Sequence, residues 1–165
     1  YTSYTPYQSE VSQGRLEALL NFQTVVSDLT AMPLANCSLL DEATAAAEAA
    51  TMMFGLRSRA QQKAGADTLF VDEEVFPQVL AVIRTRAIPQ GMKIRTGNYK
   101  ILEFTPDIFG CIVQYPNNSG SVEDYRAFTE QAHAAGCKVA VDADIMALVL
   151  LTPPGEWGAD IVFII

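Results

Sequence analysis

The sequence has few of the residues that build metal centres and disulfide frameworks. It contains one histidine, His133, and three widely spaced cysteines, Cys37, Cys111 and Cys137. No Cys-x-x-Cys pair and no His/Cys cluster occurs, so a metal site is not expected. A scattered, odd set of thiols is typical of small apolar side chains in a reducing compartment.

Positive charge is also scarce. Eleven lysines and arginines stand against 19 aspartates and glutamates, which gives a net charge of −8. No basic face can balance a phosphate backbone, so the composition argues against nucleic acid and against anionic membrane surfaces. No apolar run approaches the roughly 18 residues that span a bilayer, and the first residues do not form a signal peptide. We therefore expect neither nucleic acid nor a membrane as a partner.

Phosphate-binding and hydrolytic motifs are absent as well. Neither G-x-G-x-x-G nor G-x-x-x-x-G-K-[ST] occurs, so a dinucleotide or P-loop site has no support. No serine or cysteine lies in a nucleophile elbow, so Ser/His/Asp hydrolysis is not indicated.

The pattern that is present is that of a globular α/β protein. Half of the 165 residues are hydrophobic, and residues 1–165 are expected to form a single domain. Helices are expected over residues 12–32, 41–65, 76–85 and 121–135, and strands over 67–71, 93–103 (a strand or a hairpin), 109–115, 138–141, 147–151 and 159–165. Strands that are apolar on both faces and alternate with helices predict a mostly parallel sheet covered by helices on both faces.

Local signals mark several helix ends. Gly65 is expected to end the second helix, and Ser121, with Asp124 three residues later, to cap the last one. Asp41 and Glu42 occupy the first turn of the second helix, where they complement the helix dipole and would repel a phosphate. We expect these carboxylates, rather than a bound anion, to cap that helix.

Polar residues follow the expected strands, where open α/β sheets bind their ligands. They are residues 72–74, residues 115–120, Asp142 and Asp144. The two aspartates have two interpretations: paired carboxylates that bind a metal or transfer protons, or solvated and capping side chains. His133 lies near a helix C-terminus, where a partly protonated imidazole is favourable.

The amino-terminal residues 1–11 contain three tyrosines within seven positions, Tyr1, Tyr4 and Tyr7. The ends of soluble domains normally fray. Such a dense set of aromatic and polar groups therefore indicates a segment that docks onto something or lines a site.

Six segments together resemble the P-protein of the glycine cleavage system, glycine dehydrogenase (decarboxylating). They are YTPYQ (residues 4–8), SQGRLEALLNFQ (12–23), ANCSLLDEAT (35–44), RAIPQG (86–91), QYPN (114–117) and PPGEWGAD (153–160). The resemblance covers essentially the whole chain. It implies the large domain of the fold-type-I aminotransferase architecture, the PLP-dependent transferase fold.

The resemblance also implies an activity. The family's enzyme decarboxylates glycine on pyridoxal phosphate, passes the aminomethyl group to the lipoyl arm of the H-protein and releases CO2. Its protein has two homologous halves, or two subunits, and this chain resembles the amino-terminal half, whereas the cofactor lysine belongs to the carboxyl-terminal half. The resemblance therefore implies no catalytic residue and no bound pyridoxal phosphate in this chain alone. The implied partners are the carboxyl-terminal half or second subunit, the lipoylated H-protein and glycine.

The lysines agree with that division. In this fold the Schiff-base lysine follows the strand-end aspartate, but Lys63, Lys93, Lys100 and Lys138 all precede Asp142.

Site residues follow from the same resemblance. Asp144 matches the amino-half pattern. His133 and Asp142 have the spacing of the cofactor-half pattern, in which an aspartate contacts the pyridine nitrogen, so all three residues are candidates for positions near a cofactor. The tyrosine-rich segment implies contributors to the substrate side or to the interface between halves, namely Tyr4, Thr5, Tyr7 and Gln8.

Three hypotheses for function remain open. The chain is a fragment of glycine dehydrogenase that is inactive in isolation, a non-catalytic scaffold half that dimerises with the cofactor-bearing half, or a stand-alone aminotransferase-like binding domain. Apolar faces left exposed are expected to favour a homo-oligomer. The expected location is the cytoplasm of a bacterium, or the mitochondrial matrix of a eukaryote.

Overall fold

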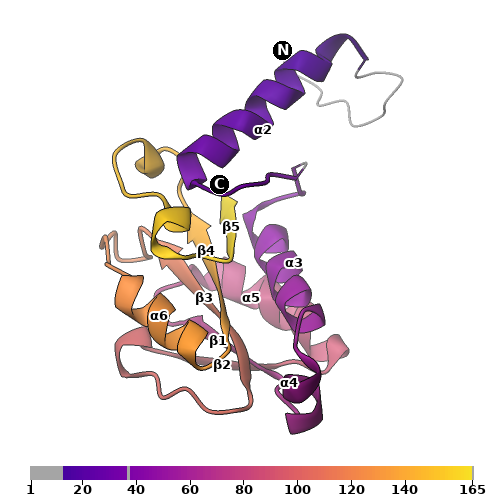
Figure 1. Cartoon of the computed structure of the whole chain (residues 1–165), viewed down its shortest axis with the longest axis vertical. Coiled ribbons are helices and arrows are strands. Elements are labelled where there is room, and N and C mark those ends of the chain that lie inside the picture. Colours follow the sequence, from indigo (N-terminus) through magenta and orange to yellow (C-terminus); the bar gives the residue numbers. More distant parts are fainter. Residues whose placement is uncertain (1–12, 37, 165) are drawn as a thin grey trace.

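A five-stranded sheet forms the centre of the computed structural model, which describes residues 13–36 and 38–164. The strands pair in the order β2-β1-β3-β4-β5, and every pairing is parallel (Figure 1). Both β1 and β3 are buried along their whole length, as expected of strands covered on two sides. The strands are β1 (Thr68–Asp72), β2 (Lys93–Gly97), β3 (Ile108–Tyr115), β4 (Lys138–Ala143) and β5 (Ile161–Ile164).

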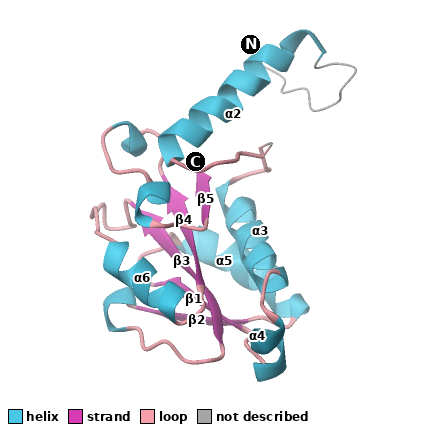
Figure 2. Ribbon diagram, viewed as in Figure 1, coloured by secondary structure: helices cyan, strands magenta, loops and turns pink. Residues whose placement is uncertain are grey.

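Helices lie on both sides of this sheet (Figure 2). The α-helices of the described residues are α2 (Leu16–Thr30), α3 (Glu42–Gly55), α4 (Arg59–Ala64), α5 (Pro77–Ala87) and α6 (Arg126–Ala134). α3 and α5 pack on one face, and α6 packs on the other. The predicted fold class, a mostly parallel sheet with helices on both faces, is confirmed.

Two buried clusters fill the spaces between the sheet and its helices. In the first, Ala46 and Ala50 of α3 belong to the same cluster as Ile112 of β3, because small side chains let a helix approach a sheet closely. The second is rich in aromatic rings, and Tyr125 and Trp157 have ring centroids 5.8 Å apart.

The single helix expected over residues 41–65 is wrong, because the structure has two helices there. α3 ends at Gly55 and Ser58 caps α4: its hydroxyl accepts from Gln61 N, and the Gln61 side chain accepts from Ser58 N. This capping box starts a new helix within a run whose composition favours a continuous one. Gly65 ends α4 with a φ of 73°, as predicted.

The expected start of the helix over residues 121–135 is also wrong. α6 begins at Arg126, and Ser121 belongs to the preceding turn, where its N–H donates to Asn117 Oδ1 at 2.8 Å. Residues 93–103 form β2 followed by a 3₁₀ helix, Tyr99–Ile101.

Residues 147–151, expected to be a strand, contain the 3₁₀ helix Ala147–Val149. Leu148 N donates to Asp144 O at 3.2 Å and Leu150 N to Ala147 O at 3.0 Å. These short-range bonds satisfy the backbone groups that a strand would pair with a neighbour.

α2 projects away from the sheet and its helices (Figure 1). At its carboxyl end Leu29 packs against the aromatic-rich cluster and Thr30 is buried. Towards its amino end Leu16, Leu20 and Phe22 are exposed by 59%, 63% and 53%. An amphipathic helix normally buries its apolar side. The apolar side of α2 is instead largely exposed to solvent.

The turn that contains Gly155 holds the carboxyl end of α2. A Cβ added at Gly155 would collide with the Ala31 carbonyl and lie 2.8 Å from the Thr30 carbonyl oxygen. Both neighbours are backbone atoms, which cannot give way as a flexible side chain can. Trp157, 8% exposed, fixes the same turn in the core.

Gly155→Ala is therefore expected to lower the free energy of unfolding by about 1–3 kcal/mol, because the turn must move away from α2. Chemical denaturation measures the loss, and faster hydrogen exchange of the α2 amides reports the undocking. Gly55→Ala is the matched control, because a Cβ added there meets nothing within 4 Å. Equal stability of the two variants would show that this close approach does not hold α2.

Candidate functional site

A hollow of about 460 Å³ opens at the carboxyl edge of the sheet. Its lining comes from residues that follow β1, end or follow β3, or follow β4: Phe76, Gln114, Pro116, Asn117, Asp144 and Met146. β1 has β2 on one side and β3 on the other, so the strand order reverses next to this hollow. Open α/β sheets bind ligands at such a point.

Gln114 connects two elements at the hollow. It is the second-last residue of β3, it is 3% exposed, and its Oε1 accepts a hydrogen bond from Phe76 N at 2.7 Å. Phe76 is the residue before α5, a helix without a side-chain cap, so Gln114 satisfies a donor at the helix start. A polar side chain inside the apolar run of β3 was the signal in the sequence for this role.

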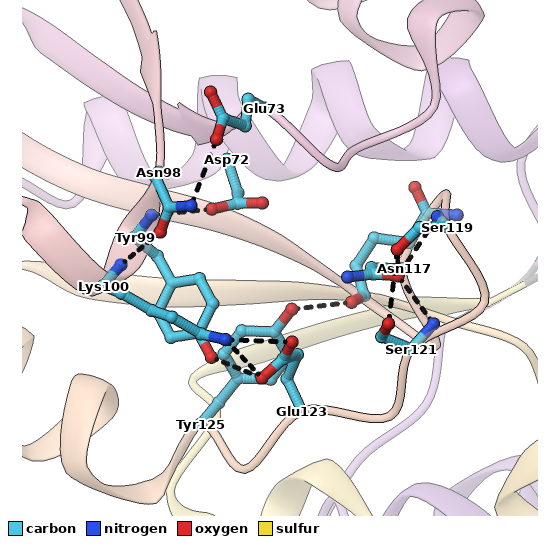
Figure 3. A network of polar contacts seen from close by, with 11 residues as sticks. Asp72, Glu73, Asn98, Tyr99, Lys100, Asn117, Ser119, Ser121, Glu123 and Tyr125 are labelled. Carbon is cyan, nitrogen blue, oxygen red and sulfur yellow. Dashed lines mark hydrogen bonds and ion pairs between the residues drawn. The ribbon is translucent and has the colours of Figure 1, made fainter.

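Asp72 holds the loops after β1 and β2 together (Figure 3). It is 2% exposed, and its carboxylate accepts from Glu74 N at 2.9 Å and from Tyr99 N at 2.8 Å. Burial raises the pKa of Asp72, and these two backbone bonds oppose that rise. The carboxylate therefore acts as a fixed acceptor for two turns.

A second set of polar contacts joins the loop after β2 to the segment before α6 (Figure 3). Tyr99 Oη donates to Glu123 Oε2 at 2.9 Å, and Lys100 Nζ lies 3.0 Å from the same oxygen. The bonds from Lys100 and Tyr99 lower the pKa of Glu123. Burial, followed by the bond to Glu123, raises the pKa of Tyr99. Lys100 is thus already paired at this edge.

Asn117 fixes the turn that follows β3 (Figure 3). Its Oδ1 accepts from Ser119 N at 3.1 Å and from Ser121 N at 2.8 Å. The same turn bonds to the loop after β1, since Asn118 N donates to Glu74 O at 2.8 Å. The hollow therefore has a rim held by hydrogen bonds on the β1 and β3 sides.

The structure separates the two aspartates of the sequence pattern. Asp142 lies within β4 and is 0% exposed, facing the α3 side of the sheet beside Glu42. Asp144 follows the strand, is exposed, lines the hollow and accepts from Met146 N at 2.8 Å. Strand alternation ends at Ala143, so residues two apart no longer share a direction.

His133 lies at the opposite, amino edge of the sheet, so the structure does not bring it together with the aspartates. Its Nε2 is 2.8 Å from Asp160 Oδ2, and Lys138 Nζ is 3.0 Å from Asp160 Oδ1. A smaller hollow of about 290 Å³ there is lined by both basic residues and by Arg57. This position agrees with the helix C-terminal interpretation of the histidine.

The residues at the carboxyl edge do not fit pyridoxal phosphate. None of the four lysines in the sequence lines the hollow, and Lys100 is paired with Glu123. At the start of α3, Asp41 accepts from Thr44 N at 2.7 Å and Glu42 follows it. A phosphate group would meet negative charge at that helix end, as the sequence predicted.

The candidate residues Tyr4, Thr5, Tyr7 and Gln8 lie outside the described part of the chain, as does Cys37. Cys111 and Cys137 are buried free thiols, and burial raises the pKa of each. In residues 13–36 and 38–164, no group of three or more His, Cys, Asp or Glu side chains is placed to hold a metal ion. Within the same residues no helix has the length and apolarity to cross a membrane.

Sequence reasoning missed the apolar wall of the hollow and the partner of Asp142. Phe76 and Met146 carried no motif, because any apolar residue near a strand end has the same pattern. Glu42 is distant from Asp142 along the chain, so only the folded structure shows that they meet.

Comparisons with known proteins converge on one family. A family profile described as "Glycine cleavage system P-protein" matches residues 1–164. A glycine dehydrogenase (decarboxylating) from Bacteroides fragilis is 77% identical over 163 residues, which are 99% of this chain and 17% of that relative. The chain therefore spans about one-sixth of the length of such relatives.

Solved structures give the same result. A glycine decarboxylase (P-protein) of the glycine cleavage system, in inhibitor-bound form, is similar with a TM-score of 0.81 and 36% identity, over 98% of this chain and 36% of the other. The apo methionine gamma lyase CalE6 from Micromonospora echinospora has a TM-score of 0.70 at 19% identity, over 98% and 44% of the two chains. The second likeness shows the fold alone, which is that of fold-type-I enzymes.

Asp160→Asn is expected to lower the free energy of unfolding by about 1–3 kcal/mol at neutral pH, because a charged acceptor of three hydrogen bonds is lost. Burial alone would raise the pKa of Asp160, but bonds from Val139 N, His133 and Lys138 outweigh it and hold the pKa below its usual value. The stability that Asp160 contributes is present above the unfolded-state pKa and is lost as the pH falls through the folded-state pKa.

Urea denaturation at several pH values checks this expectation. The difference between wild type and Asp160→Asn should shrink below about pH 4. Asp124→Asn is the matched control, because the Asp124 carboxylate is 67% exposed and its pair with Arg126 lies at the surface. A difference between wild type and Asp160→Asn that does not change with pH would contradict the assignment.

Proposed function

This chain belongs to the glycine cleavage system P-protein family, and from that membership we propose that it forms part of the first half of a glycine-decarboxylating enzyme. The complete enzyme decarboxylates glycine on pyridoxal phosphate, transfers the aminomethyl group to the lipoyl arm of the H-protein and releases CO2. The bacterial relatives favour the cytoplasm as its location.

The proposal gives this chain a supporting role rather than the cofactor site. The observation that carries it is the absence of a lysine at the hollow, since Lys63, Lys93 and Lys138 lie elsewhere and Lys100 is paired. The acidic first turn of α3 supports the same division. The cofactor and its lysine then belong to the carboxyl-terminal half or to a second subunit.

The exposed side of α2 is the surface we assign to that other half. Leu16, Leu20 and Phe22 are more than half exposed, and the chain amounts to 17% of the length of a close relative. A helix that extends from the domain with its apolar side uncovered is typical of a segment that packs against another part of a larger protein. This surface favours the scaffold hypothesis as a second candidate function.

The tyrosine-rich segment precedes α2 and is proposed to reach the active site formed with the other half. Tyr4, Thr5, Tyr7 and Gln8 supply phenol, hydroxyl and amide groups that can position a carboxylate and exclude water, which favours loss of CO2 from the cofactor adduct. Asp144 is proposed as the aspartate nearest to that site, since it lines the hollow and is exposed.

A chimeric enzyme tests the function directly. The matching segment of the Bacteroides fragilis glycine dehydrogenase is replaced by the 163 residues of this chain that align with it, and the product is assayed with glycine, pyridoxal phosphate and lipoylated H-protein. We expect CO2 release within about tenfold of the parent enzyme, since the two segments are 77% identical. A chimera that assembles and binds cofactor but releases no CO2 would refute the proposed function.

The isolated chain provides the complementary measurement. We expect no absorbance band of a lysine-bound pyridoxal phosphate when the cofactor is added to it. A band that borohydride removes would show that one of the four lysines holds the cofactor, and the division of roles would then be wrong.

Two substitutions in the chimera separate an active-site role from a scaffold role. Tyr7→Ala is expected to reduce turnover by roughly tenfold or more with assembly intact, whereas Leu20→Glu should weaken assembly, because it places a charge in an apolar contact. Asn21→Glu is the control for Leu20→Glu, since it adds the same charge to an exposed polar position of α2. Light scattering measures assembly and CO2 release measures turnover. If Tyr7→Ala abolished assembly, the role of the tyrosine-rich segment would be structural rather than catalytic.

A further inference from the structure

Three buried carboxyl oxygens without a hydrogen-bond partner meet between α3 and β4. They are Oδ1 and Oδ2 of Asp142 and Oε1 of Glu42. In the described residues only one other buried side-chain oxygen, Thr129 Oγ1, lacks a partner. Buried polar groups are nearly always hydrogen-bonded, so three such oxygens at one place require a physical explanation.

The fold forces these two carboxyl groups together. Asp142 is 0% exposed on β4, and its side chain shares the face of Ala140, which belongs to the cluster beneath α3. Glu42 is the first residue of α3, directly after the N-cap Asp41. The pair therefore connects the start of a helix to the carboxyl end of a central strand.

Among the described residues, no positively charged side chain acts on Asp142. The neighbouring strands place Gln114 of β3 and Phe163 of β5 beside Asp142, and neither is ionisable. On α3, Glu48 accepts a bond from Arg86 of α5, so that guanidinium is directed to a different carboxylate.

The other nearby acids face elsewhere. The exposed Asp41 binds Thr44 N, and the exposed Asp144 binds Met146 N. Among the described residues Glu42 is the one charged neighbour that acts on Asp142.

Two ionised carboxylates in this position would be costly. Burial disfavours the charged form of Asp142, and the charge of Glu42 adds to that effect, so both raise the pKa of Asp142. A single proton removes one of the two charges and gives the neutral carboxyl a donor for the other. Facing carboxyl groups elsewhere share protons for the same reason.

We propose that Glu42 and Asp142 bind one proton between them, and that this shared proton holds the first turn of α3 against the end of β4. The site takes a proton rather than a hydrated metal ion, because the part of the chain that the structure describes groups no third acidic or imidazole side chain with these two carboxylates, and two offer too few ligands. Gln114 is next to Asp142 across the sheet and lines the hollow, so loss of the proton would disturb the carboxyl edge. The proposal is independent of the enzymatic role given above.

The sign of the pH effect follows from the site. The folded chain keeps a proton that the unfolded chain releases above the ordinary aspartate pKa. Stability is therefore fully present below that pKa and falls as the pH rises towards the higher folded-state value. Between the unfolded-state pKa and the folded-state pKa, the ratio of folded to unfolded protein should fall by up to about tenfold for each pH unit.

Urea unfolding of this chain at a series of pH values tests the proposal. The free energy of unfolding of wild type should fall as the pH rises above about 5. That of Asp142→Asn should not depend on pH in this range, so the variant should be the more stable of the two at about pH 8. Glu42→Gln should also flatten the profile, since its amide can donate to an ionised Asp142. Glu130→Gln, at an exposed position of α6, is the matched control and should keep the wild-type slope.

A carbon NMR titration of the side-chain carboxyls gives a readout that does not depend on refolding any variant. The Asp142 signal should titrate well above the ordinary range of an aspartate, because burial and the neighbouring Glu42 raise its pKa. Titration of Asp142 in the ordinary range, or an unchanged slope in Asp142→Asn, would overturn the proposal. Stabilisation of wild type, but not of Asp142→Asn, by Mg²⁺ or Ca²⁺ would overturn it as well, because the site would then bind a metal cation.

Discussion

Coverage of a parallel sheet on both faces is the constraint on which the rest of this structure depends. It demands strands that are apolar on two sides, such as β3, where all eight residues are buried. Polar side chains that bond to the turns must then lie where strands end. Asp72, Asn117 and Asp144 do so, and each satisfies backbone donors of a turn that the apolar strands cannot satisfy.

The two edges of the sheet use their polar residues differently. At the amino edge, the Asp160 carboxylate bonds to Val139 N, His133 Nε2 and Lys138 Nζ, so the Lys138 ammonium balances its negative charge. At the carboxyl edge, Asp72 is held mainly by backbone N–H groups, and Asp142 faces another acid. The Asp160 carboxylate is thus paired with a cation of the same chain, whereas Asp72 and Asp142 depend on backbone donors and on a neighbouring acid.

Features that depend on residues close together in the chain could be predicted from the sequence, and features that depend on distant residues could not. The buried strands, the α/β class and the Gly65 helix end could be predicted, since each depends on residues close in the chain. The break at Ser58 was missed because alanine-rich composition and a four-residue capping box favour opposite outcomes, and the box prevailed. The start of α6 was misplaced because Ser121 has the chemistry of a cap, but Asn117 binds its N–H instead.

The candidate site was less predictable, and for a different reason. The sequence indicated the carboxyl ends of the strands, where the hollow lies, and it left two interpretations of Asp142 and Asp144 open: paired carboxylates, or solvated and capping side chains. Their separation depends on where β4 stops, a single position that alternation cannot specify. The sequence predicts Glu42 as a partner of the helix dipole, and that role is compatible with its interaction with Asp142, since Glu42 lies in the first turn of α3.

Charge, as well as the lack of a lysine at the hollow, supports the division of roles that we propose for the complete enzyme. A phosphate-bearing cofactor needs a helix start that attracts anions, but α3 begins with Asp41 and Glu42. Reversing that preference would take several substitutions, because Asp41 caps the helix through Thr44 N and Glu42 is tied to Asp142. We therefore propose that this part of the protein supports the cofactor-bearing half rather than holding the cofactor, and that the exposed side of α2, which projects from the sheet, makes the contact (Figure 1).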